Sequence, residues 1–129
     1  MIVPPITIRG LIVSNEGDEP VKTSGRLEVT FHELEQDDLM VFYGSTERRK
    51  RLRPRALVVK WDQRLGTDEW RLWHVWLAGE LVRQDSHTSG SMTLYEAPNY
   101  MHEGGWAENT PDWVKPLVEQ SRPAEKVAS

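Results

Sequence analysis

The tryptophan-rich segment over residues 70–83 constrains the fold of this chain more than any other part of the sequence. A helix here would contain Gly79, which costs about 1 kcal/mol relative to Ala, and would depend on Val and Trp, which form helices poorly. The segment is therefore predicted to be one long strand, bulged near Gly79. Because side chains alternate along a strand, one of its faces is predicted to carry Trp73, Val75, Leu77, Gly79 and Leu81.

A hydrophobic period of two residues indicates a second strand. Apolar and polar residues alternate in the run Leu27, Glu28, Val29, Thr30, Phe31 and His32. This pattern predicts a dry face of apolar side chains and a wet face of polar ones. Short apolar or β-branched runs separated by polar turns predict further strands, joined as sequential hairpins, over residues 5–13, 39–43, 56–61 and 92–95.

One helix is predicted near the C-terminus, over about residues 110–121. Thr110 can cap it and Pro111 fits its first position, and an apolar face is formed by Trp113, Val114, Leu117 and Val118. Pro116 lacks the amide hydrogen that a helix interior requires, so the helix is expected to be short, kinked or split there. Residues 122–129 are predicted to form a flexible tail.

These elements predict a mainly β (α+β) protein with a single antiparallel sheet, or a small barrel, of about six strands and one C-terminal helix. The chain has 129 residues, which suits one β-rich domain over residues 1–121. The helix is expected to cover one face of the sheet or to plug one open end. Without that cover, the apolar side chains of the tryptophan-rich strand would be exposed to water.

The composition excludes several classes of protein. The chain has no cysteine, which rules out disulfides, thiolate nucleophiles and cysteine-ligated metals. It also has no apolar stretch near the roughly 18 residues of a membrane span, and its first residues lack the pattern of a signal peptide. We therefore expect a soluble, cytoplasmic protein without a membrane partner.

The densest cluster of charge, here called the basic run, covers residues 48–55. Its cations are Arg48, Arg49, Lys50, Arg51, Arg53 and Arg55, and the rest of the chain has 10 basic against 20 acidic residues. We predict an exposed loop that binds either the acids of a protein partner or nucleic-acid phosphates, with bases stacking on Tyr43 and Trp61. The alternative is that the run is solvated or neutralises the protein's own acids, such as Glu33, Glu35, Asp37 and Asp38.

A second predicted contact surface is the face of the tryptophan-rich strand that carries Trp70, Leu72, His74 and Trp76. Aromatic side chains beside polar ones are typical of interface centres. If the helix covers the opposite face, this face is available to another chain, and a homodimer is the simplest case. The alternative is that all of these tryptophans belong to the core.

The sequence contains no recognisable catalytic motif: no nucleophile elbow, no phosphate-binding loop and no dinucleotide fingerprint. The histidines at positions 32, 74, 87 and 102 lack metal-ligand spacing, so no metal and no cofactor are expected. An acid–base pair such as His74 with Glu80 is the enzymatic alternative. The sequence favours a non-enzymatic protein-interaction module, with a nucleic-acid-binding protein and a virion or assembly component as alternatives.

The second half of the chain contains a strand ending in Trp61, the Trp-Arg-Leu sequence at 70–72, the Pro-Asp-Trp-Val sequence at 111–114 and Arg122-Pro123. In these features residues 56–122 resemble small β-rich proteins of actinobacteria and their phages, a group with no defined activity. The preference for Arg over Lys, 11 against 5, agrees with a high-GC genome. The resemblance implies an accessory protein of an actinobacterial phage or prophage, acting in the host cytoplasm.

Overall fold

The structure, a computed structural model, describes residues 4–14, 17, 22–42, 49–82 and 87–123. Within them lie seven strands and one helix. The strands are β1 (Ile6–Ser14), β2 (Lys22–Glu33), β3 (Leu39–Phe42), β4 (Arg49–Arg64), β5 (Arg71–Val82), β6 (His87–Glu96) and β7 (Gly105–Trp106), and the helix is α1 (Val114–Gln120).

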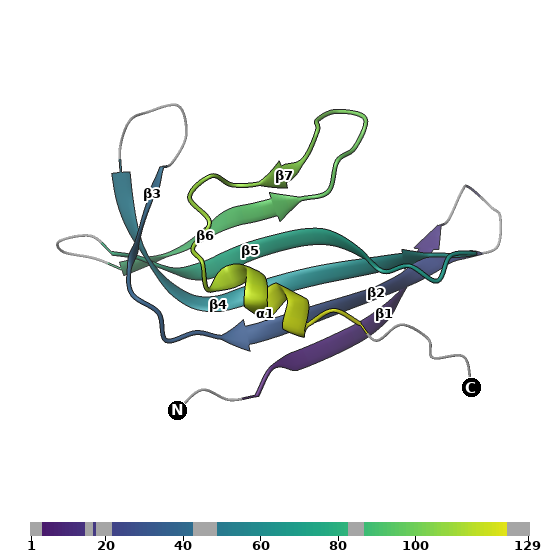
Figure 1. Cartoon of the computed structure of the whole chain (residues 1–129), viewed down its shortest axis with the longest axis horizontal. Coiled ribbons are helices and arrows are strands. Elements are labelled where there is room, and N and C mark those ends of the chain that lie inside the picture. The colour runs from purple at the N-terminus through teal and green to yellow at the C-terminus, as the bar shows by residue number, and fades with distance from the viewer. Residues whose placement is uncertain (1–3, 15–16, 18–21, 43–48, 83–86, 124–129) are drawn as a thin grey trace.

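The strands form one open antiparallel sheet in the order β1-β2-β4-β5-β6-β7 (Figure 1). This confirms the mainly β fold with one C-terminal helix, and it selects the open sheet over the barrel. β3 lies off this path and pairs with the first residues of β4, from Arg49 to Leu52. In Figure 1, β3 and this part of β4 stand away from the rest of the sheet.

The tryptophan-rich segment is extended, as predicted, and pairs with β4 on one side and β6 on the other. The predicted bulge near Gly79 lies on the partner strand, where Arg55 is the extra residue opposite Gly79 and Ala78. A second bulge, not predicted, makes Trp73 the extra residue between Leu72 and His74. A bulge places successive side chains on the same face, so it changes the predicted alternation at this end of β5.

The prediction of a basic loop over residues 48–55 is wrong for the residues that the structure describes. Residues 49–55 belong to β4 and pair with β3 and β5. The run folds as a strand because apolar side chains alternate with its cations. Leu52 and Pro54 are buried on the core side of the sheet, and Arg51 and Arg55 are exposed.

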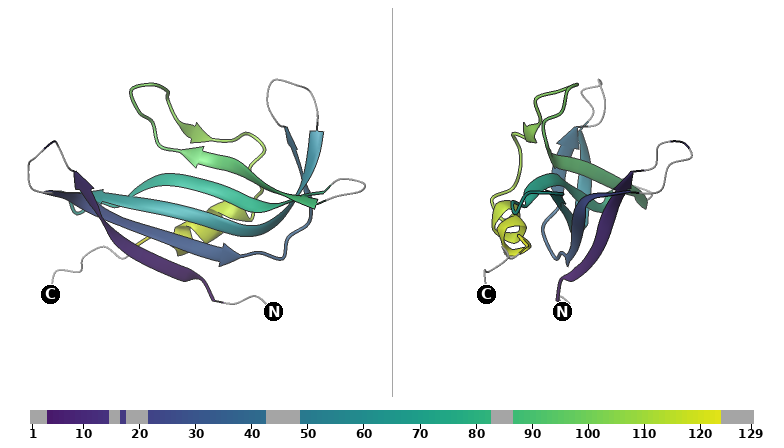
Figure 2. Two further views of the ribbon diagram at one scale, coloured as in Figure 1. Left: turned by 180° about the vertical axis from the view of Figure 1, so that it is seen from behind. Right: turned by 90° about the vertical axis from the view of Figure 1, so that its right-hand side faces the viewer.

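The core lies between one face of the sheet and α1. Val114 and Val118 of the helix are buried against β4 and β5, where the core residues are Leu52, Leu57, Val59, Trp61, Val75, Leu77 and Leu81. Figure 2 shows α1 on one side of the sheet, and in its left view no described element lies in front of β1, β2, β4 and β5. The helix therefore covers one face, as expected, and leaves the other uncovered.

The helix begins at Val114, later than the predicted position 110. Thr110 forms a turn instead, with its hydroxyl donating to the carbonyl of Ala107. This start places Pro116 in the first turn, where a backbone amide has no partner within the helix, so the proline removes no hydrogen bond. The helix is short, as expected, and it ends before the predicted tail.

The first two residues of the predicted tail, Arg122 and Pro123, pack against the rest of the fold. The guanidinium of Arg122 lies over the ring of Trp61, 4.5 Å from its centroid, and Pro123 is buried. Residues 124–129 lie outside the described part of the chain.

The two faces of β2 are the reverse of the prediction. The polar face carries Thr30 and His32, and both are buried on the side of the helix. The apolar face carries Leu27, Val29 and Phe31, which remain partly or largely exposed on the uncovered side. The prediction failed because β4 and β5 determine which face the helix covers, and β2 follows their register.

Candidate functional site

The uncovered side of the sheet, here called the open face, is largely apolar. Cross-strand partners in a sheet share a face, so the registers of β1, β2, β4 and β5 identify its members. The apolar members include Ile6, Ile8, Leu27, Val29, Phe31, Val58 and Trp76. The bulge at Trp73 places that side chain on the same face, beside Lys60. None of these residues belongs to the core beneath α1.

Aromatic side chains form the centre of the open face. Val58 pairs with Phe31 on one side and Trp76 on the other, and it is only 3% exposed although no helix covers it. Lys60 lies over both tryptophans, with its Nζ 4.9 Å from the ring centroid of Trp76 and 5.7 Å from that of Trp73. The long side chains thus pack on one another and leave a ridge that faces water.

The charged groups around this ridge have partners on the same face. The guanidinium of Arg71 donates to both carboxylate oxygens of Asp62, with nitrogen–oxygen distances of 3.2 and 3.0 Å. This hydrogen bonding raises the pKa of Arg71. His74 stacks beside Trp76, and its Nε2 lies 3.9 Å from a carboxylate oxygen of Glu96. Burial, together with the charge of Lys60, lowers the pKa of His74.

The four residues predicted to share one contact surface lie on two faces. Trp70 and Leu72 pack against the core on the helix side, whereas His74 and Trp76 belong to the open face. The bulge at Trp73 causes this division, because it shifts the alternation between Leu72 and His74. The bulge also brings Trp73, which the prediction placed with the core face, onto the open face.

Two cations of the basic run, Arg53 and Arg55, are paired with acids of the same molecule. The Nε of Arg53 donates to Asp38 at 3.0 Å, and Arg55 lies 3.7 Å from Glu80. The hydrogen bond from Arg53 holds the pKa of Asp38 below its usual value, and the charges of Arg51 and Arg55 act in the same direction. This is the predicted alternative in which the run neutralises the protein's own acids.

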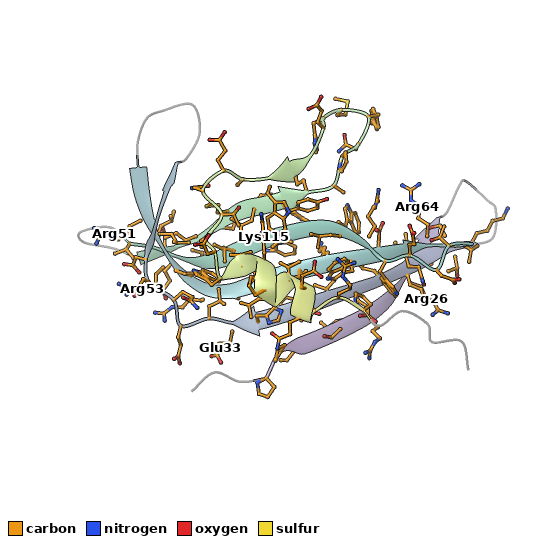
Figure 3. The ribbon with its side chains drawn as sticks, viewed as in Figure 1. Arg26, Glu33, Arg51, Arg53, Arg64 and Lys115 are labelled. Atoms are coloured by element: carbon orange, nitrogen blue, oxygen red, sulfur yellow. The ribbon has the colours of Figure 1, made fainter. Side chains whose placement is uncertain are left out.

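The described cations do not gather in one patch. Figure 3 shows Arg51 and Arg53 at one end of the sheet and Arg26 and Arg64 at the other. Arg48 and Tyr43 lie outside the described residues, and only the backbone of Arg49 and Lys50 is described. Trp61, the other predicted stacking residue, is buried beneath Arg122 and is not accessible to a base.

Two histidines that are distant in the sequence meet at one carboxylate. His102 Nε2 lies 3.4 Å from Glu96, whose other oxygen faces His74. The predicted acid–base partner Glu80 is six residues from His74 on the same strand, or about 20 Å away. Among the described residues, no group of three His, Asp or Glu side chains is arranged to hold a metal ion.

His32 is a buried histidine on the helix side of β2. It is 4% exposed, pairs across the strands with Leu57, and its Nε2 has no hydrogen-bond partner. Burial lowers its pKa, because the low-dielectric surroundings disfavour the charged imidazolium. Burial thus favours the neutral form of His32 over the charged one.

The free energy of unfolding is expected to fall as the pH drops below about 6.5, the ordinary pKa of histidine. The unfolded chain binds more protons at His32 and His74 than the folded one, so stability is greatest above this pH. Each group changes the free energy by at most about 1.4 kcal/mol per pH unit. Urea unfolding at about pH 7.5, 6.5 and 5.5, which spans the ordinary pKa of histidine, would measure the slope of the free energy of unfolding against pH.

The variant His32→Leu should reduce this slope, and the double variant with His74→Gln should reduce it further. The carboxyl groups of Asp38 and Glu119, whose pKa values are lowered by arginines, act below about pH 4.5 and do not enter the window. If the slope is unchanged in the double variant, His32 and His74 do not cause the loss of stability at low pH.

Two shallow hollows lie elsewhere on the described part of the chain. The larger, of about 840 Å³, lies at the turn between β4 and β5 and includes Leu11, Arg26 and Arg64 in its lining. The smaller, of about 440 Å³, lies beside β7 and includes Glu96 and His102. Both are open, and Thr93 in the lining of the smaller one has its hydroxyl 3.5 Å from Nε2 of His74.

Comparison with known proteins gives no relative: no protein family, curated protein or solved structure matches this chain. The described part of the chain contains no helix long and apolar enough to cross a membrane.

The residues that sequence analysis missed are the apolar ones of β1 and β2. Val29 and Phe31 were expected on the dry face of their strand, and no face was predicted for Ile6 and Ile8, yet all four lie on the open face. The sequence did indicate an uncovered apolar face, because β4 and β5 alone supply enough apolar side chains to pack against one short helix. The apolar rows of β1 and β2 were therefore in excess.

Proposed function

We propose that this protein acts by binding another protein chain through its open face, rather than by catalysing a reaction. The observation that supports this proposal is the aromatic ridge of Phe31, Trp73 and Trp76 on a face that no described element covers. A contiguous apolar patch that a protein exposes to solvent commonly marks an interaction site. Aromatic residues are also the commonest anchors of protein interfaces.

Nucleic-acid binding is less well supported. A phosphate backbone is bound by cations that are available to it, and Arg53 and Arg55 are paired with Asp38 and Glu80. On the resemblance of residues 56–122, we also propose that the binding takes place in the cytoplasm of an actinobacterial cell, as part of a phage or prophage function.

Site-specific photo-crosslinking tests the proposal. A photo-reactive amino acid would replace Ile8 in the full chain, expressed in an actinobacterial host, and in a matched control it would replace Leu11. Both residues lie on the edge strand β1 and are similarly exposed, at 56% and 63%, but they face opposite sides of the sheet. We expect a protein adduct at position 8 in several-fold excess over position 11.

Equal yields at the two positions, or an adduct at position 8 that nuclease removes, would overturn the proposal. Adducts at position 11 alone would move the binding surface to the hollow at the turn between β4 and β5, and would overturn it as well.

A further inference from the structure

We propose that a second copy of this chain covers the open face, so that two sheets pack face to face in a twofold-symmetric dimer. This inference rests on the proposed function and names the partner. It follows from the size of the open face, from its charge balance and from the composition of its edge strand.

The size of the open face matches what a stable dimer buries. The four neighbouring strands β1, β2, β4 and β5 build it, and β2 has 12 residues, of which Ser24 is the extra residue of a bulge opposite β1. At about 3.3 Å per residue and about 4.8 Å between strands, the face measures about 40 by 20 Å. This is on the order of 800 Å², the area that each partner contributes to a standard interface.

The charges on this face permit contact with an identical copy. The protein has a net charge of −4, so a face of a single sign would repel its copy. The rows that cross β4 between Val58 and Asp62 instead carry Lys60 and Arg71 against Asp62 and Glu96. Arg71 is already bonded to Asp62, and Lys60 lies on the tryptophans, so docking leaves neither cation without a partner.

The edge strand β1 has the composition of an interior strand. Its sequence, ITIRGLIVS, contains one charge, whereas edge strands that face water usually carry several charges or a proline. Ile6 and Ile8 point to the open face and are more than half exposed. Packing of a second sheet at about 10 Å would bury both, as in a β-sandwich.

A strongly charged partner fits this face less well than a second copy. Its cations and anions balance within the face, so it offers no excess charge to attract an acidic or a basic surface. In an isologous dimer, moreover, each residue of the patch is used twice, so that one substitution changes two contacts.

The test is the oligomeric state of the purified full chain. Sedimentation equilibrium over a wide range of protein concentrations would be measured for the natural chain and for the variants Ile8→Lys and Leu11→Lys. We expect the natural chain to dimerise with little dependence on salt. Ile8→Lys should weaken dimerisation by about 30-fold or more, the effect of losing a hot-spot contact, and Leu11→Lys should leave it unchanged.

Circular dichroism and thermal unfolding would confirm that each variant is folded, as expected for side chains more than half exposed in the natural chain. The variant Phe31→Lys gives an independent test on the neighbouring strand. A natural chain that remains a monomer, or a dimer that survives both Ile8→Lys and Phe31→Lys, would overturn the inference. If the chain is a monomer but forms adducts with another protein at position 8, the partner is not a second copy of this chain. The proposed function, binding of a protein through the open face, would then still hold.

Discussion

Replacement of Trp61 by alanine is expected to lower the free energy of unfolding by about 3–5 kcal/mol, the range for removing a large buried aromatic side chain. Trp61 is 1% exposed and lies on β4 against α1. Its Nε1 donates to the hydroxyl of Ser121 at 3.3 Å, and the guanidinium of Arg122 covers its ring. The variant therefore loses packing, a hydrogen bond and the attachment of the residues that follow the helix.

Urea unfolding at one fixed protein concentration would measure the effect. The matched control is Tyr100→Ala, because Tyr100 is 97% exposed and its loss should change the free energy by no more than about 0.5 kcal/mol. Trp61→Phe should fall between the two, since the smaller ring keeps part of the packing without the hydrogen bond. A Trp61→Ala variant as stable as Tyr100→Ala would contradict the described contact between sheet and helix.

A methyl group added at Gly79 is expected to destabilise the fold by about 3 kcal/mol, at the upper end of typical overpacking costs. A Cβ at this position would overlap the carbonyl oxygen of Arg53, and it would lie 2.9 Å from the carbonyl carbon of that residue. These are backbone atoms held by the bulge at Arg55, so they cannot rotate away as a flexible side chain would.

Gly10→Ala is the control for this prediction. Gly10 also lies within a strand, but nothing lies within 4 Å of a Cβ built there, and its φ is not positive. The added methyl should be neutral or stabilise the protein by up to about 1 kcal/mol. Equal losses from Gly79→Ala and Gly10→Ala, again measured by urea unfolding, would show that close approach of β4 is not the cause.

Most strands were predictable because their hydrophobic period is local information. The long strand at residues 71–82 follows from the cost of Gly79 in a helix and from the apolar residues around it. The basic run was misassigned as a loop because its cations outweighed the apolar alternation of Leu52 and Pro54. The late start of the helix depends on the turn at Thr110, whose hydroxyl bonds backward to Ala107 rather than forward as a cap.

The open face was only partly predictable from the sequence. The prediction correctly found that one side of β5 would be left uncovered, with His74 and Trp76 on it. It missed the bulge at Trp73, because an extra residue in one strand depends on the register of its partner and leaves no local pattern. It also missed Phe31 and Ile8, because which side of β2 meets the helix is decided by β4.

The position of α1 after every strand has a consequence for how the chain folds. Trp61 and Ser121 are 60 residues apart, so the contact that joins the layers closes only after the whole sheet has been synthesised. During translation, the earlier hairpins can pair while both sides of the nascent sheet are still bare. A product that stops before residue 114 would keep all the strands but would expose the apolar side chains of both sheet faces. It is therefore expected to aggregate.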